Sequence, residues 1–217
     1  MIYLFITATI TPARSVWGPI DTNDRKSRYD RCISATLQYI KERNLIKPVI
    51  IVNDPGVTKS FFDEYDCDVV YASTNNPRYH NKGINELYAI KCAIAKYNVR
   101  DDDIIIKQTG RYCPCSPYFY NKVTSYCGKY DAFAKFYNVC RFEYEDNDCI
   151  LGLVGLKCKY FRTFEYSHDH NGFDGDSPEV EFAKHIRNNV DPDRVMALGE
   201  LELELNFANN PGESLFV

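Results

Sequence analysis

The fold can be deduced from one segment, RDDDIIIKQTGRYCPC, which covers residues 100–115. Three acidic residues precede a short apolar run, and the run ends in the polar turn QTGR at residues 108–111. A short apolar run bounded by turn residues is typical of a strand that is buried on both faces. The segment therefore predicts a buried strand over residues 103–107, with acidic side chains before it and a basic one after it.

The preceding chain repeats this kind of strand and alternates it with helices. Residues 2–10 are apolar, β-branched and aromatic almost throughout, and further strand-like runs cover residues 48–53 and 68–72. Between the strands, apolar side chains recur at helical spacing over residues 29–40 and 87–97. Strands that alternate with helices predict an α/β fold with a Rossmann-type, mostly parallel sheet flanked by helices.

The second half of the chain predicts a mixed arrangement. Strand-like runs cover residues 131–137 and 150–156, and a helix should begin at Ser177, which a first-turn proline and an acid follow. Residues 200–207 alternate Glu with Leu, as a half-exposed edge strand or an amphipathic tail would. The chain length favours a single domain over residues 1–217, with one half at 1–112 and the other at 113–217.

Composition limits the classes of function. The chain has 26 Lys and Arg against 30 Asp and Glu and no basic block, so we do not expect a nucleic-acid partner. No apolar run approaches the roughly 18 residues of a transmembrane segment, and the start lacks a basic leader, which predicts a cytoplasmic protein. The nine scattered cysteines predict reduced thiols, and the close pair Cys113 and Cys115 lacks the spacing and second pair of a zinc site.

The two ends of the opening segment have different expected roles. Ligands of open α/β sheets bind beyond the carboxyl ends of the parallel strands, so Asp101, Asp102 and Asp103 should form a solvated turn at the opposite edge. The carboxyl edge is instead expected to gather five cations: Arg14, Arg78, Lys82, Lys107 and Arg111. Any one of them could be an ordinary surface cation. Because the chain as a whole is acidic, the set predicts a phosphate-bearing ligand.

This order of elements resembles the GT-A fold of nucleotide-sugar-dependent glycosyltransferases, over roughly residues 1–112. The pair NKGINELYAIKCAI (81–94) and DIIIKQTGRY (103–112) is similar to a pairing in small transferases associated with surface polysaccharides. There, a Lys-Gly-x-Asn-Glu helix start precedes a Lys-x-Thr-Gly-Arg-Tyr strand end. The resemblance implies a GT-A-like enzyme that moves a hexosyl or pentosyl group from a nucleotide-sugar donor to a glycan hydroxyl, in polysaccharide or glycoprotein glycan synthesis.

The resemblance also implies which residues bind the donor. The expected contacts with base and ribose are Thr7, Ala8, Thr9, Arg14, Asn53 and Asp54. The expected contacts with ribose or phosphates are Lys82, Gly83, Asn85, Lys107, Gln108, Thr109 and Gly110, where glycine would let the backbone pass close to the donor. Arg111, helped by Lys107 or Lys82, would stabilise the diphosphate leaving group through bidentate hydrogen bonds.

Metal dependence is left open by a departure from the family pattern. Many GT-A enzymes carry Asp-x-Asp at this strand end to hold Mn²⁺ or Mg²⁺, whereas this chain has QTGR at residues 108–111. We therefore assign no metal ligand, although either ion could still take part. The segment at residues 168–176, with two His and three Asp, could bind a divalent ion, but such Gly-rich loops more commonly form a mobile acceptor lid.

The acceptor side is expected to supply a general base. In inverting GT-A enzymes a carboxylate at a comparable helix start takes the acceptor proton, and the candidates here are Glu179, Asp176 and Glu181, in that order. Glu179 could equally do no more than favour the helix start. Two other functions remain: a noncatalytic nucleotide-sugar or glycan binding module, and a sugar nucleotidyltransferase, which usually opens with a Gly-rich loop that residues 7–14 lack.

Overall fold

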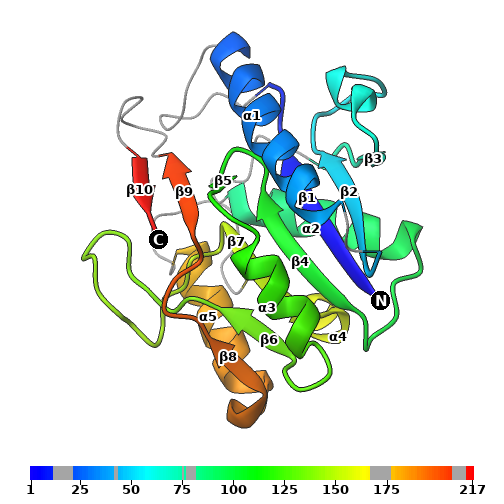
Figure 1. Ribbon diagram of the computed structural model, residues 1–217. Helices are drawn as coiled ribbons and strands as arrows, with labels where there is room; N and C mark the ends of the chain where they lie inside the picture. The colour runs from blue at the N-terminus through cyan, green and yellow to red at the C-terminus, as the bar shows by residue number, and fades with distance from the viewer. Residues whose placement is uncertain (12–21, 42–43, 75, 77–81, 167–176, 207–213) are drawn as a thin grey trace.

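The computed structural model describes residues 1–11, 22–41, 44–74, 76, 82–166, 177–206 and 214–217. A seven-stranded sheet in the order β3-β2-β1-β4-β7-β6-β8 forms its centre (Figure 1). A second sheet of three strands, in the order β10-β9-β5, lies beside it. Sheet and helices together form the mixed α/β architecture that the alternating sequence pattern predicts, and the predicted fold class is confirmed.

The large sheet has a parallel part and a mixed part. The parallel strands are β1 (Ile2–Ala8), β2 (Ile46–Val52), β3 (Asp68–Tyr71) and β4 (Ile104–Thr109). The remaining strands are β7 (Leu153–Lys157), β6 (Ala132–Ala134) and β8 (Val195–Ala197). Strand β7 runs antiparallel to both β4 and β6, and β8 runs parallel to β6. The expected strands of the second half therefore exist, but β6 and β7 are shorter than the apolar runs predicted.

The register of the parallel strands brings their carboxyl ends to one edge of the sheet. Ala8 is paired with Val52, Val52 with Tyr71, and Thr7 with Thr109. The loops that follow β1, β2, β3 and β4 therefore leave the sheet at the same edge, which we call the carboxyl edge. The opposite edge, where these strands begin, is called the amino edge.

Helices cover both faces of the large sheet. One face packs against α1 (Thr22–Ile40) and α3 (Tyr118–Tyr126). The other packs against α2 (Lys82–Lys96), α4 (Cys158–Thr163) and α5 (Pro178–Asn189). Two short 3₁₀ helices, η1 (Phe61–Glu64) and η2 (Pro192–Arg194), complete the elements. Side chains of β4 alternate between the two cores, with Ile104 and Ile106 on the α1 side and Ile105 on the α2 side, as the period of a strand requires.

The small sheet corrects one expectation about residues 200–207. Strand β9 (Leu203–Asn206) lies between β10 (Ser214–Phe216) and β5 (Cys113–Pro114), so it is a central strand and the edge-strand prediction is wrong. The predicted alternation is confirmed, because Leu203 and Leu205 are buried while Glu202 and Glu204 are partly exposed. Its neighbours β5 and β10 have only two and three residues, so β9 can be central although few nearby residues look strand-like.

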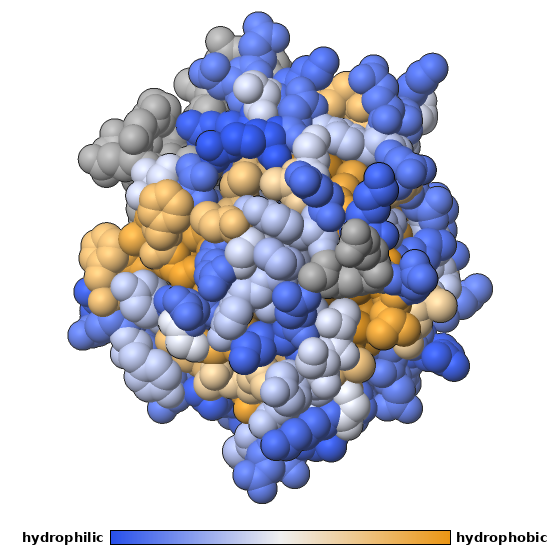
Figure 2. Space-filling view, in the orientation of Figure 1, coloured by the Kyte–Doolittle hydropathy of each residue, from blue (hydrophilic) through white to orange (hydrophobic). Residues whose placement is uncertain are grey.

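The surface is largely hydrophilic on the side that Figure 2 shows, with separate apolar patches. The large apolar side chains that are most exposed include Phe142 and Tyr144 from the loop after β6 and Phe216 from β10. Most other apolar residues belong to the two cores. In the part of the chain that the structure describes, no helix has the length and apolar character needed to cross a membrane.

Candidate functional site

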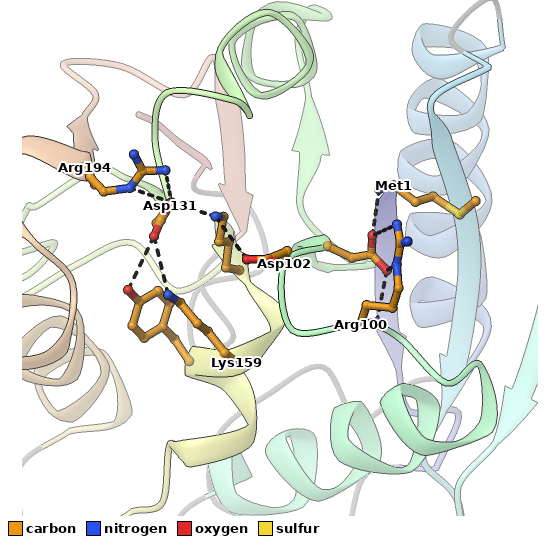
Figure 3. A network of polar contacts seen from close by, with 9 residues as sticks. Met1, Arg100, Asp102, Asp131, Lys159 and Arg194 are labelled. Atoms are coloured by element: carbon orange, nitrogen blue, oxygen red, sulfur yellow. Dashed lines mark hydrogen bonds and ion pairs between the residues drawn. The ribbon is translucent and has the colours of Figure 1, made fainter.

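The amino edge holds the acidic residues of the opening segment in ion pairs (Figure 3). The Asp103 carboxylate lies 2.7 Å from the Met1 amino group and 3.1 Å from the Arg100 guanidinium, and Asp102 lies 3.4 Å from the Lys157 ammonium. Burial alone would raise the pKa of Asp103, but hydrogen bonds from Arg100 and the amino group lower it to about 2. These acids thus lie at the edge opposite to the strand ends, as the sequence predicts. The expected solvation is wrong for Asp103, which is buried in its ion pairs.

A second buried acid at the amino edge is surrounded by cations. Asp131 accepts a hydrogen bond from Arg194 Nε at 2.9 Å and lies 3.1 Å from Lys157 Nζ (Figure 3). Burial opposes ionisation, yet the hydrogen bonds from Arg194 and Lys157 lower the pKa of Asp131 below its ordinary value. Among the residues with assigned positions, no group of three or more His, Cys, Asp and Glu side chains is placed to hold a metal ion.

At the carboxyl edge, the loop after β1 is fixed by its neighbours. The Tyr29 hydroxyl accepts from Thr9 N at 2.9 Å, and Arg25 Nε donates to Thr9 O at 2.7 Å. The Asp54 carboxylate accepts from the backbone N–H groups of Ile10 and Thr11, each at 2.7 Å. Burial raises the pKa of Asp54, while these two hydrogen bonds oppose the rise. Asp54 therefore positions the loop that was expected to meet the base and ribose.

Two asparagines join the ends of β2, β3 and α2. Asn53 Nδ2 donates to Asn85 O at 3.1 Å, and its Oδ1 accepts from Thr74 N at 3.0 Å and from the Thr74 hydroxyl at 2.7 Å. Asn85 exchanges two hydrogen bonds with the backbone of Asn76, at 2.9 and 3.1 Å. Both amides are engaged within the protein, and their expected contacts with a donor stay predictions.

Lys107 and Gln108 are adjacent in β4 and point to opposite faces of the sheet. Gln108 is fully buried on the α1 side, where its Nε2 donates to Thr36 Oγ1 at 2.8 Å and its Oε1 accepts from the Tyr120 hydroxyl at 2.6 Å. These bonds connect β4 to α1 and α3 (Figure 1). Gln108 thus holds the strand end in place rather than presenting its amide to the solvent.

Lys107 is buried on the α2 side. Its ammonium donates to Thr109 Oγ1 at 2.9 Å and to Leu151 O at 2.7 Å, and it lies 3.0 Å from the Glu86 carboxylate. Glu86 also accepts a hydrogen bond from the Thr7 hydroxyl. A lysine ammonium has three donors, so these contacts occupy all of them. The predicted assistance of Lys107 to a bound diphosphate stays a prediction.

A small cavity lies beside this ion pair. Its volume is about 10 Å³, near the space that one water molecule needs. It is lined by Gly83, Glu86 and Lys107 and by apolar side chains of α2, α4 and α5 together with Leu151, Phe164 and Tyr166. A cavity of this size does not accommodate a nucleotide.

Tyr112, at the carboxyl edge, interacts electrostatically with one cation and two carboxylates. The guanidinium carbon of Arg111 is 5.9 Å from the centroid of the Tyr112 ring. Burial raises the pKa of Tyr112, the charge of Arg111 opposes the rise, and the carboxylates of Glu179 and Glu86 add to it. One tyrosine is therefore within electrostatic reach of the predicted diphosphate-binding residue and the predicted base.

Gly152 makes the position of Tyr112 possible. A Cβ atom on Gly152 would lie 2.3 Å from Cδ2 and 2.5 Å from Cε2 of the Tyr112 ring, which is far below contact distance. The carbonyl of Gly152 also accepts from Thr109 N at 2.8 Å. Sequence reasoning missed this residue, although an isolated glycine in a strand-like run signals a close approach of another chain segment.

Gly110 has a similar explanation. Its N–H donates to Thr7 O at 2.9 Å, and an added Cβ would lie 3.0 Å from that oxygen and 3.1 Å from Ile6 and Tyr29 atoms. Close packing against the end of β1 and against α1 therefore accounts for the glycine without a ligand. The expected passage of the backbone beside a donor stays a prediction.

Glu179 lies in the first turn of α5, where the sequence predicts it. Ser177 caps the helix, since its hydroxyl accepts from Val180 N at 3.3 Å. Close to Glu179 is Asp148, an acid that sequence reasoning missed: burial, with contributions from Glu179 and Glu145, raises the pKa of Asp148 to about 6. The third candidate base, Glu181, is buried.

Several predicted residues lie outside the described residues. They are Arg14, Arg78, Asp176 and the His- and Asp-rich segment at residues 168–176. Lys82 begins α2, but its side chain lies outside the description. The structure therefore brings Thr7, Glu86 and Lys107 into contact in one cluster and places Arg111 beside Tyr112.

Comparison with known proteins identifies relatives at the level of the fold. The chain is similar to a Desulfovibrio desulfuricans protein provisionally assigned as a nucleotide-diphospho-sugar transferase, with a TM-score of 0.54, 13% identity, and coverage of 91% of this chain and 79% of that one. It is also similar to a nucleoside-diphosphate-sugar pyrophosphorylase from Vibrio cholerae, with a TM-score of 0.54, 11% identity, and coverage of 97% and 96%. No family model matches the sequence, and the search of curated proteins found no match. The chain thus shares its mostly parallel α/β fold with proteins named for nucleotide-sugar chemistry.

Proposed function

We propose that this protein is a GT-A-type glycosyltransferase that moves a hexosyl or pentosyl group from a nucleotide-sugar donor to a hydroxyl group of a glycan. The observation that carries the proposal concerns Tyr112. It interacts electrostatically with the Arg111 cation and with the carboxylates of Glu179 and Glu86. Glycosyl transfer needs positive charge for the departing diphosphate and a base for the acceptor hydroxyl, at opposite ends of one short reaction path.

Arg111 would supply the positive charge. A guanidinium binds phosphate oxygens through paired hydrogen bonds and stays charged when partly buried. Its neighbour Arg25 adds to the local positive potential: burial lowers the pKa of Arg25, Tyr29 opposes this, and the charge of Arg111 lowers it further. Two guanidinium groups beside the loop after β1 favour an anionic group at that place.

Glu179 would act as the general base. It would take the proton of the acceptor hydroxyl while the acceptor oxygen attacks the anomeric carbon and the diphosphate leaves toward Arg111. Glu179 lies in the first turn of α5. The carboxyl group of Asp148 interacts electrostatically with that of Glu179. Asp176, outside the described residues, is the alternative base.

One alternative function has a specific observation in its favour. The alignment with the Vibrio cholerae pyrophosphorylase covers nearly the whole of this chain and of that protein. Its TM-score equals that of the alignment with the transferase. A nucleotidyltransferase would join a sugar 1-phosphate to a nucleoside triphosphate and would need the cations of the carboxyl edge, but no base for a glycan hydroxyl. A noncatalytic nucleotide-sugar binding module would likewise not need Glu179.

The test begins with a panel of UDP-, GDP-, CMP- and dTDP-sugars, measured by thermal stabilisation and by donor hydrolysis, with Mn²⁺ or Mg²⁺ and again with EDTA. We expect at least one donor to stabilise the protein and to be hydrolysed slowly. The same samples are then offered nucleoside triphosphates with sugar 1-phosphates. Formation of nucleotide sugar and pyrophosphate would support the nucleotidyltransferase instead, and retention of stabilisation in EDTA would show that binding needs no ion.

Variants then assign the roles. Arg111→Ala should weaken donor binding by about 10- to 100-fold, the cost of losing a charged hydrogen-bonding partner, whereas Lys129→Ala at the amino edge should not change it.

Glu179→Gln should lower turnover by about 10²- to 10⁴-fold with donor binding intact, and the exposed Glu64→Gln serves as the control. Full turnover in Glu179→Gln would exclude this residue as the base, and absence of any nucleotide-sugar binding would reject the proposal.

A further inference from the structure

The segment between β6 and β7 leaves the large sheet at the carboxyl edge. Strand β6 is antiparallel to β7, and β7 is antiparallel to β4, so β6 runs in the same direction as the parallel strands. Ala132 and Ile105 both pair with Leu156, so β6 and β4 are also level with each other. The segment after β6, drawn in yellow-green at the left of Figure 1, therefore extends from the same edge as the loops after β1 and β4.

Residues 136–149 of this segment form a hairpin, which we call the aromatic hairpin. Its first and last residues are paired, and Asn138 is paired with Glu143. The Asn138 side-chain oxygen accepts from two backbone N–H groups of the turn, at 2.9 and 3.0 Å, and its backbone oxygen accepts from Phe142 N at 2.8 Å. Phe142 has a φ of 58°, which is uncommon for a bulky residue and persists only where neighbouring contacts enforce it. The hairpin is therefore held in one shape by its own hydrogen bonds.

Two aromatic side chains of the aromatic hairpin lie in the solvent. Phe142 is 59% exposed and Tyr144 is 64% exposed. On the face that Figure 2 shows, apolar residues gather where Figure 1 draws this hairpin. Exposed aromatic side chains that a rigid turn holds outward are typical of an interaction surface.

The base of the aromatic hairpin contacts the helix that carries the proposed general base. The Cys149 thiol donates to Glu179 O at 3.4 Å. Arg187 of α5 donates to Asp146 at 2.5 Å and to the Tyr144 hydroxyl at 3.4 Å. The Tyr144 hydroxyl also donates to Asp146. One of the two exposed rings is thus tied to the helix whose first turn carries Glu179.

The charge of the aromatic hairpin limits the class of partner. Residues 136–149 contain four acidic side chains and one arginine, so the net charge of the hairpin is negative. An anionic partner such as a nucleic acid or an acidic lipid surface would be repelled. Carboxylates accept hydrogen bonds from hydroxyl groups, and aromatic rings pack against apolar C–H groups. A neutral sugar presents both kinds of group, so its chemistry matches this surface.

The size of the exposed surface favours a chain-like ligand over a protein. A buried aromatic side chain covers about 150–250 Å², so the two rings supply at most about 500 Å². A stable interface between two proteins needs roughly 800 Å² on each side. A second copy of this chain therefore does not fit the two rings alone, whereas an oligosaccharide needs only one ring face for each sugar unit that stacks.

We propose that the aromatic hairpin binds a neutral oligosaccharide, with Phe142 and Tyr144 stacking on sugar units of the acceptor chain beyond the unit that reacts. This role rests on the proposed glycosyl transfer, because the reacting hydroxyl would belong to the end of the chain that lies at Glu179. The contacts of Cys149 and Arg187 with α5 and Tyr144 would keep the stacking rings in register with that end. The hairpin thereby favours long acceptors over short ones.

The first test needs no donor and uses native gels that each contain one neutral polysaccharide: starch, dextran, mannan, galactomannan, xyloglucan or mixed-linkage β-glucan. We expect at least one of them to retard the wild-type protein. Phe142→Ala combined with Tyr144→Ala should weaken this binding about 10-fold, since each stacked ring contributes a factor of about three or more. Tyr126→Ala, which removes an exposed ring at the end of α3, is the matched control and should leave the retardation unchanged.

Three outcomes would overturn the proposal. Absence of retardation in every gel, or equal retardation of the wild type and the double variant, would exclude a glycan at these rings. Sedimentation velocity at rising protein concentration tests the third outcome, since a dimer that disappears in the double variant would assign the rings to a second copy of the chain. Both rings are exposed, so their removal should leave the melting temperature unchanged, and thermal melts check this.

The length of the acceptor gives the second test. With a donor from the nucleotide-sugar panel, the KM for a hexasaccharide of the retarding polysaccharide should rise about 10-fold in the double variant, whereas the KM for the matching disaccharide should stay the same. Equal rises for both would place the rings at the reacting sugar and would overturn the proposal.

The two proposals can fail separately. Ring-dependent retardation in the gels, with no donor that binds, would reject the glycosyl transfer and keep the oligosaccharide surface. A donor that binds, without ring-dependent retardation, would reject the surface and keep the transfer.

Discussion

The two edges of the large sheet hold buried aspartates whose pKa values are shifted in opposite directions. At the amino edge, cations outweigh burial and lower the pKa of Asp103 and Asp131. At the carboxyl edge, burial dominates and raises the pKa of Asp54 and Asp148. The amino edge thus favours the charged form of its aspartates, whereas the carboxyl edge disfavours the charged form. Unfavourable electrostatics that persist in a fold are typical of sites kept for a function.

The comparison also shows that the most acidic stretch of sequence is a poor indicator of a ligand site. Asp101, Asp102 and Asp103 are consecutive, and each lies close to a cation: Asp101 is 3.0 Å from Arg162, and the other two pair as described above. By contrast, Asp148 and Glu179 come from distant segments, and their carboxyl groups interact electrostatically only in the folded protein. Function is better sought where acids gather in space than where they gather in sequence.

Replacing Lys107, at the carboxyl edge, should cause the largest loss in the free energy of unfolding. Lys107→Met removes the cation from the half-buried Glu86, and loss of one partner of a buried pair should lower the free energy of unfolding by about 3 kcal/mol. Its counterpart at the amino edge, Lys157→Met, should cost less than about 1 kcal/mol, because Asp131 keeps its contact with Arg194. Urea denaturation of both variants measures the difference, and equal losses would contradict it.

Gly152→Ala should have the next largest effect. The added Cβ cannot share space with the Tyr112 ring, so either the ring or strand β7 must move, at a cost of about 2 kcal/mol in the free energy of unfolding. Gly128→Ala is the matched control, since a Cβ there meets nothing within 4 Å, and it should change stability by less than about 0.5 kcal/mol. Thermal melts should separate the two variants by several degrees. Similar melting temperatures would mean that Tyr112 has room to move.

The pH dependence of stability should sharpen the comparison, with a smaller effect. The folded pKa of Asp148, about 6, lies above the ordinary 3.8, so its contribution to stability is full below pH 3.8 and is lost as the pH rises through 6. The folded pKa of Asp103, about 2, lies below 3.8, so its contribution is present above 3.8 and is lost as the pH falls through 2.

Two variants test these opposite signs. Relative to the wild type, Asp148→Asn should gain stability, measured as the free energy of unfolding, as the pH rises from about 4 to about 7. Asp103→Asn should lose stability at neutral pH, and the loss should shrink as the pH falls toward 2. Denaturation curves at a series of pH values give both results. If the wild type instead gained stability relative to Asp148→Asn as the pH rises, the fold would not disfavour the charged form of Asp148, and the prediction would be wrong.

Much of the fold follows from local sequence. The apolar runs of β1, β2, β3 and β4 and the helical spacing between them predict a mostly parallel sheet, and the rule for ligand sites in such sheets then selects one edge. The central position of β9 could not be predicted, because its partners β5 and β10 are strands of only two and three residues. Pairing across the chain, rather than local preference, decides that arrangement.

The site was less predictable than the fold for a related reason. Polar residues at strand ends can bind a ligand or bind one another, and sequence does not distinguish the two uses. Asn53, Asn85 and Gln108 are engaged with protein groups because their partners, such as Thr74 and Tyr120, happen to lie within reach in the folded chain. The contact between Gly152 and Tyr112 joins segments forty residues apart. Only Glu179 at the start of α5 could be located from local helix signals.

The central position of β1 has a consequence for how the molecule folds. Ile2 is paired with Ile46 on one side and with Ile104 on the other, so one edge of β1 can close early and the other only after a much longer loop has formed. Until β4 pairs with it, a strand that is mostly apolar offers unpaired backbone groups to any other chain. Refolding should therefore lose yield as protein concentration rises, and a chaperone that shields this strand should restore it.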